Sequence, residues 1–149
     1  MLIELGPELA SLLVVSFLAA TLLPLGSEVL LLGLVGQMPE QSAWFWLSAS
    51  VGNTLGGLTN WWLGKYLLRY QHKRWFPVSE KRLLQVQSWV RRFGFPALLL
   101  SWLPVVGDAI CLAAGVARLN VWLTCLWIFI GKSLRYAVVV LGTSALVLS

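Results

Sequence analysis

Four long apolar segments make up most of the chain, and two of them are interrupted near the middle. The first extends from about Leu9 to Val35 and the third from Phe95 to Val116, and both contain proline and glycine within the apolar run. The second, from about Ser42 to Leu68, and the fourth, from Asn120 to about Leu148, continue for the roughly 20 residues that a membrane-spanning helix needs. The pattern therefore predicts two broken helical segments, each followed by a spanning helix.

The interruptions share one arrangement, in which an acidic residue stands four positions after a proline. The predicted breaks are Pro24, Gly26, Pro104 and Gly107. Proline removes a backbone donor and kinks a helix, and glycine loosens it. The halves of the first segment, Leu9–Leu23 and Val29–Gly36, are too short at ~1.5 Å per residue to cross a roughly 30 Å hydrocarbon core. We therefore expect a re-entrant helical hairpin, with one kinked spanning helix as the alternative.

One strongly polar stretch, Arg69 to Arg92, separates the two halves of the chain. Ser79 is a suitable N-cap, and apolar residues follow it at roughly helical spacing. These residues are Leu83, Leu84, Val86, Trp89 and Val90. Because the rest of the stretch is largely basic, we predict an amphipathic helix that lies on the cytoplasmic face of the membrane.

Composition supports a membrane protein. The 149 residues are 58% hydrophobic and 11% charged, against a charged fraction of about 25% in soluble proteins. Nine tryptophans fit the same class, because indole favours the membrane interface. We expect one all-α integral membrane domain over residues 1–149. It would comprise a first repeat at about 9–68, a basic linker at about 69–93 and a second repeat at about 94–148.

Positive charge is concentrated between Lys65 and Arg92, which hold eight of the eleven lysines and arginines. Basic residues of membrane proteins remain on the cytoplasmic side, so the loop 65–92 is predicted to be cytoplasmic in a multi-pass protein. Nucleic acid is the alternative partner for such a cluster, and we do not favour it. Membrane lipids, including anionic headgroups, are the expected partners.

The two halves can be superimposed in sequence. When Glu28 is placed on Asp108, the stretch GNTLG at Gly52–Gly56 falls on GKSLR at Gly131–Arg135. The distance from the acid to the first glycine is 24 residues in one half and 23 in the other. Because each half has one spanning helix, the second half would enter the membrane from the opposite face, as in an inverted repeat. The alternative is that the two halves match by chance, or only because both need small residues for helix packing.

Lys132 and Arg135 lie near the middle of the last spanning segment. Inserting either cation at the centre of a membrane-spanning helix costs about 2.5–3.5 kcal/mol, unless the cation is paired or hydrated. We expect these cations to pair with Glu28 and Asp108 near the membrane midplane. An anionic headgroup that displaces a carboxylate, or a proton that neutralises it, would then change the charge of the site. A static ion-pair network is the alternative.

The second segment carries small and amide residues on one side. Gly52 and Gly56 have the GxxxG spacing that lets another helix approach closely, within the chain or between chains. Asn53 and Asn60 are seven residues apart and share a face. They are candidates for the polar lining of the site, or for hydrogen bonds that hold two helices together.

The sequence contains no recognisable catalytic or metal-binding constellation. His72 is the single histidine and lies in the basic stretch, while Cys111 and Cys125 lie in apolar segments where cysteine is usually a small hydrophobic residue. We therefore predict no enzyme, no metal and no cofactor.

Four stretches together resemble the DedA family of SNARE-associated or VTT-domain membrane proteins, and within it the short YqaA-type members. They are LPLGSEVLLLGLVG, SVGNTLGGLTNWWLGK, LLLSWLPVVGDAICLAAG and FIGKSLRYAVV. The resemblance implies a bacterial inner-membrane protein with two re-entrant hairpins. It also implies translocation of lipids such as undecaprenyl phosphate or phospholipids, in some relatives driven by the proton motive force.

The resemblance assigns the hairpin glutamate of the family to Glu28. Where the family usually has arginines around the second proline, this chain has Ser101 and Gly107, and an acid of the family is replaced by Gly57. Lys132 and Arg135 would have to supply the positive charge instead. The expected function is transport of a lipid or lipid phosphate. The alternatives are an ion or small-solute carrier and a non-transporting protein of envelope integrity. With two full spans per chain, a homodimer is compatible with each.

Overall fold

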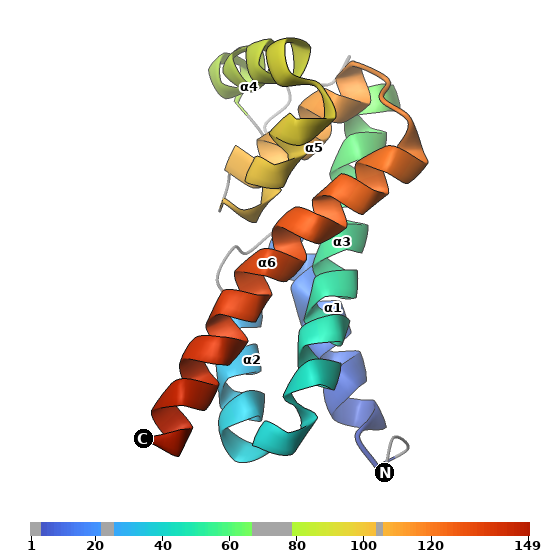
Figure 1. The fold of residues 1–149 in the computed structure, drawn as a ribbon. Helices are drawn as coiled ribbons and strands as arrows, with labels where there is room; N and C mark the ends of the chain where they lie inside the picture. Colours follow the sequence, from blue (N-terminus) through green and yellow to red (C-terminus); the bar gives the residue numbers. More distant parts are fainter. Residues whose placement is uncertain (1–3, 22–25, 67–78, 104–105) are drawn as a thin grey trace.

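The computed structural model describes residues 4–21, 26–66, 79–103 and 106–149, and its regular elements in these ranges are all helical (Figure 1). In chain order they are α1 (Gly6–Thr21), α2 (Gly26–Gln37), the 3₁₀ helix η1 (Pro39–Gln41), α3 (Ser42–Tyr66), α4 (Glu80–Phe93), the 3₁₀ helix η3 (Phe95–Trp102), α5 (Val106–Val116) and α6 (Val121–Leu148). Within the described ranges, the one helix that is both long and apolar enough to cross a membrane is Val121–Val147. The prediction of an all-helical membrane protein agrees with this structure.

The helices are arranged along α6, which extends from one end of the molecule to the other (Figure 1). Helices α1 and α2 lie side by side in the half that contains both termini, and we call them hairpin one. Elements η3 and α5 pack together in the opposite half, and we call them hairpin two. Helix α3 contacts α1, α5 and α6, so it connects the two halves.

Glycines bring α3 close to hairpin one. A Cβ atom at Gly52 would overlap the backbone of Leu13 on α1, and one at Gly56 would overlap Ala20. The prediction that this GxxxG pair allows close approach is confirmed, and the partner is a helix of the same chain. The α3–α5 crossing is equally tight, because Gly64 faces the Leu112 backbone.

The apolar face of α4 packs on protein, and the predicted amphipathic helix is present over Glu80–Phe93. Its place on the cytoplasmic face of the membrane stays a prediction. Leu83, Val86 and Val90 are 1–3% exposed and belong to a core cluster shared with α5 and η3, whereas Leu84 is 62% exposed. Hairpin two offers α4 an apolar surface, so the face that the sequence assigned to lipid is covered by side chains. The N-cap prediction is confirmed, because the Ser79 hydroxyl accepts a hydrogen bond from a backbone N–H of the first turn.

Two apolar clusters form the core, and both reach α6. Ile128 belongs to the cluster around α5, and Tyr136 belongs to the cluster formed with α1, α2 and α3. Lys132 lies between these two positions along the helix and is itself 2% exposed. The chain therefore places a buried cation where the two halves of the core adjoin.

Candidate functional site

Arg135 joins both hairpins to α6. Its guanidinium forms an ion pair with Glu28, which stands in the first turn of α2, and Nε donates to the same carboxylate oxygen. Its Nη1 donates to the carbonyl oxygen of Trp102, 3.3 Å away at the C-terminal end of η3, where helical carbonyls lack partners within their own helix. The side chains of Arg135 and Glu28 are 13% and 25% exposed, so the pair is partly accessible.

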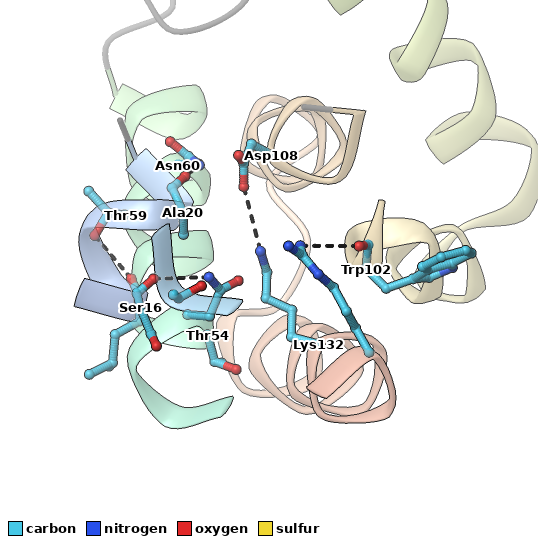
Figure 2. A network of polar contacts seen from close by, with 12 residues as sticks. Ser16, Ala20, Thr54, Thr59, Asn60, Trp102, Asp108 and Lys132 are labelled. Atoms are coloured by element: carbon cyan, nitrogen blue, oxygen red, sulfur yellow. Dashed lines mark hydrogen bonds and ion pairs between the residues drawn. The ribbon is translucent and has the colours of Figure 1, made fainter. Parts of the chain in front are cut away.

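Lys132 pairs with the acid of hairpin two. Its Nζ lies 3.5 Å from Oδ1 of Asp108 on α5, as Figure 2 shows. The lysine side chain is 3% exposed and the aspartate side chain 24%. A cation that is so deeply buried needs a partner of opposite charge, because the cost of desolvation is otherwise uncompensated.

The two ion pairs are adjacent. Lys132 and Arg135 are three residues apart on α6 and therefore share a face of that helix. Glu28 comes to this face from hairpin one and Asp108 from hairpin two. The structure thus contains the pairing that the sequence predicted, and it assigns each acid to one cation. The group carries two charges of each sign, so an incoming anion would compete with a carboxylate for a cation.

Gly57 is a neighbour of this group that sequence reasoning did not connect with Lys132. A Cβ atom at Gly57 would lie 3.5 Å from Cε of Lys132, 3.3 Å from Sγ of Cys111 and 3.1 Å from Ile128. The absence of a side chain on α3 therefore leaves space for the lysine stem. The one hint of this in the sequence was that Gly57 stands where the DedA family has an acidic residue.

Asn53 and Asn60 hold α1 against α3. Nδ2 of Asn53 donates to the Ser16 carbonyl at 2.9 Å, and Nδ2 of Asn60 donates to the Ala20 carbonyl at 3.2 Å (Figure 2). Both side chains are nearly completely buried. These contacts are those of the helix-packing alternative, and a role of the two amides as lining of a site stays a prediction.

Each segment that was predicted to be broken consists of two helical elements: α1 and α2 in the first, and η3 and α5 in the third. Pro24 and Pro104 lie outside the described residues. Gly26 and Gly107 stand directly after the interruptions, in the first turns of α2 and α5. At Gly107 a Cβ would overlap the backbone of Ser101, so this glycine allows η3 and α5 to approach closely.

A buried hydrogen bond accompanies the Glu28–Arg135 pair. The hydroxyls of Ser27 and Tyr136 are 2.8 Å apart, and both residues are fully buried. Each is the chain neighbour of one member of the ion pair, so α2 is attached to α6 by a charged and an uncharged contact. No sequence pattern beyond that adjacency predicts this bond.

The described residues contain no group of three or more histidines, cysteines, aspartates or glutamates that could bind a metal ion. Cys111 and Cys125 are free thiols. Within the part of the chain that the structure describes, the two ion pairs Glu28–Arg135 and Asp108–Lys132 are partly or deeply buried charged groups.

Comparison with known proteins identifies relatives. The VTT domain model matches residues 23–145, which include all four residues of the ion pairs. Inner membrane protein YqaA of Escherichia coli K12 is 42% identical over 136 residues, 91% of each chain. An uncharacterized protein of Haemophilus influenzae is 40% identical over 128 residues, covering 81% of this chain and 78% of the relative. No solved structure matches. The chain therefore belongs to the VTT-domain family of membrane proteins, the DedA family.

Proposed function

We propose that this protein transports a lipid with an anionic headgroup, such as a lipid phosphate or a phospholipid, across the bacterial inner membrane. The location is supported by the name of the Escherichia coli relative, an inner membrane protein. The observation that carries the proposal is the connection of each hairpin, through an acid, to a cation on one helix: Glu28 to Arg135 and Asp108 to Lys132.

Exchange of partners at Arg135 would start the transport step. A phosphate group binds the planar guanidinium through two parallel hydrogen bonds, so it can compete with a carboxylate for this cation. When a headgroup displaces Glu28, hairpin one loses its charged contact with α6 while Lys132 still holds hairpin two. In the proposed cycle, a proton then neutralises the freed carboxylate. Lipid movement and proton movement would then be coupled.

The proposal includes two re-entrant hairpins that enter from opposite membrane faces, with the basic loop 65–92 in the cytoplasm. Equivalent glycines of the two halves support it. Gly52 faces the backbone of Leu13 in the first element of hairpin one. A Cβ at Gly131 would lie 2.9 Å from the Leu99 carbonyl in the first element of hairpin two. Each half thus packs its long helix on its own hairpin in the same way.

Reconstitution into proteoliposomes tests the function. Labelled lipid phosphate and labelled phospholipid are followed across the bilayer for the wild type, Arg135→Ala and Glu28→Ala. Because both variants lose the exchangeable contact, we expect transport to fall by roughly tenfold or more, equivalent to about 1.4 kcal/mol. Glu40→Gln, at an exposed glutamate of η1, is the matched control and should behave as wild type. Wild-type rates in both alanine variants would exclude this site.

Two further measurements separate the alternatives. Ion flux recorded in the same vesicles, without lipid movement, would indicate an ion or small-solute carrier. For a non-transporting envelope protein, Glu28→Gln should be harmless to cells, whereas Gly56→Leu should be harmful because it forces α1 and α3 apart. For the transporter, both substitutions should abolish function.

A further inference from the structure

Five uncharged polar side chains converge beside the Glu28–Arg135 pair. They are Ser16 on α1, Ser27 on α2, Ser50 and Asn53 on α3, and Tyr136 on α6. All five residues are between 0% and 3% exposed. Four helices therefore direct hydroxyl and amide groups into the interior of a chain that is otherwise mostly apolar there.

Direct contacts connect most of the cluster. Ser27 and Tyr136 share a 2.8 Å hydrogen bond. The Tyr136 hydroxyl also lies near the Ser16 side chain, and the Ser16 hydroxyl has no hydrogen-bond partner among the described residues. Asn53 donates to the backbone carbonyl of the same Ser16 at 2.9 Å. Tyr136 and Asn53 thus approach one serine from α6 and α3.

The remaining serine is placed by the periodicity of α3. One stripe of this helix consists of Trp46, Ser50, Asn53 and Gly57. At one end of the stripe the indole Nε1 donates to the Ser133 carbonyl on α6 at 2.8 Å. At the other end the glycine lies against Lys132 of α6. Ser50 therefore lies on the same stripe of α3 as Asn53, about one turn away from it.

Three oxygen atoms of this cluster lack hydrogen-bond partners among the described residues: Oγ of Ser16, Oγ of Ser50 and Oδ1 of Asn53. A buried polar atom without a partner costs about 1–3 kcal/mol, and such atoms normally bind protein groups or ordered water. Three of them at one place indicate a ligand that the side chains alone do not supply.

We propose that the cluster is a binding site for internal water molecules. A buried water typically makes about three hydrogen bonds and needs both donors and acceptors around it. The hydroxyls of Ser16, Ser50 and Tyr136 provide both, and the amide oxygen of Asn53 provides an acceptor. A metal cation is disfavoured, because the positive charges of Lys132 and Arg135 belong to the same helix face.

The role of this water rests on the proposed function. It lies beside Glu28 and Arg135, whose ion pair breaks when a headgroup binds. Water at this place hydrates the freed carboxylate and passes to it a proton that comes from the aqueous phase. The neighbouring hydroxyls relay this proton, each giving one up as it receives another, so that they end neutral. The ring of Tyr136 packs in an apolar cluster with Leu12, Leu31 and Phe45, which keeps this water from exchanging freely.

Radiolytic footprinting of the full chain in lipid nanodiscs tests the site. X-ray pulses convert bound water into hydroxyl radicals that oxidise adjacent side chains, and mass spectrometry locates the products. Phe45 is the matched control, because it is an equally buried aromatic residue of the same apolar cluster. We expect Tyr136 to be oxidised several-fold faster than Phe45.

Substitutions sharpen the test. The double substitution Ser16→Ala and Ser50→Ala removes two hydroxyls that would bind water. It should lower the rate of Tyr136 oxidation several-fold. Ser11→Ala, whose hydroxyl bonds within α1 to Pro7, should leave it unchanged. Oxidation of wild-type Tyr136 no faster than that of Phe45 would overturn the proposal, whether or not the variants fold. This readout does not depend on transport. A protein whose Tyr136 is oxidised rapidly but which does not transport lipid would refute the proposed function and still support the water site.

Discussion

Gly64 and Gly115 determine how closely α3 and α5 cross. A Cβ atom on Gly64 would overlap the backbone at Leu112, and one on Gly115 would overlap the backbone at Trp61. The contact is therefore reciprocal, and neither helix can yield by moving a flexible side chain. The distance between these helices also fixes how near Asp108 comes to Lys132, because α5 carries the acid.

Gly115→Ala should destabilise the protein by about 1–3 kcal/mol, because one added methyl group must push two backbones apart. Unfolding in detergent micelles, followed by tryptophan fluorescence, measures the effect. Gly33→Ala is the control: an added Cβ would meet no atom within 4 Å beyond its chain neighbours and the backbone of its own helix, and alanine in a helix is favoured over glycine by up to about 1 kcal/mol. Equal stability of the two variants would contradict the tight crossing.

At the scale of elements, α4 is part of the folded core. It contributes Leu83, Val86 and Val90 to the cluster around α5, and its basic residues remain exposed. The helix therefore anchors the end of hairpin two that lies away from the ion pairs. Its attachment to hairpin two is a protein contact, although its sequence is that of a surface-lying amphipathic helix.

Adjacent leucines of α4 provide a test of this packing. Leu83→Ala should cost about 2–5 kcal/mol, as other large-to-small substitutions in cores do, since the side chain is 2% exposed. Leu84→Ala, at a side chain that is 62% exposed, should change stability by no more than about 0.5 kcal/mol. Denaturant unfolding compares the two. Similar losses would mean that α4 does not dock on hairpin two.

At the scale of the whole molecule, both termini lie at the end opposite α4 (Figure 1). If the basic loop 65–92 is cytoplasmic, the termini and η1 face the periplasm. Hairpin one would then enter from the periplasm and hairpin two from the cytoplasm. The ion pairs, near the middle of α6, would lie between the two aqueous phases.

Labelling of single cysteines determines this orientation. In a variant with Cys111 and Cys125 replaced by alanine, cysteine is introduced at the exposed residues Glu40 or Ser88. A membrane-impermeant maleimide applied to spheroplasts should modify position 40 at once and position 88 only after the membrane is permeabilised. Labelling of both positions from the same side would rule out the proposed topology.

The sequence by itself determined the helical segments, the membrane class and the residues of the ion pairs. Apolar runs of sufficient length can only be helical in lipid, because each backbone group must be paired within its own segment. Two acids and two cations in apolar surroundings must likewise find one another, since unpaired burial is costly. The GxxxG pair at Gly52 and Gly56 predicted close packing for an equally local reason.

Only the tertiary structure decided which groups meet. Glu28 and Arg135 are 107 positions apart, and Ser27 and Tyr136 are 109. Their pairing depends on the rotation and depth of α2 against α6, which no local pattern encodes. The same holds for the apolar face of α4. Periodicity shows that Leu83, Val86 and Val90 share a face, but whether protein or lipid covers that face depends on the position of hairpin two.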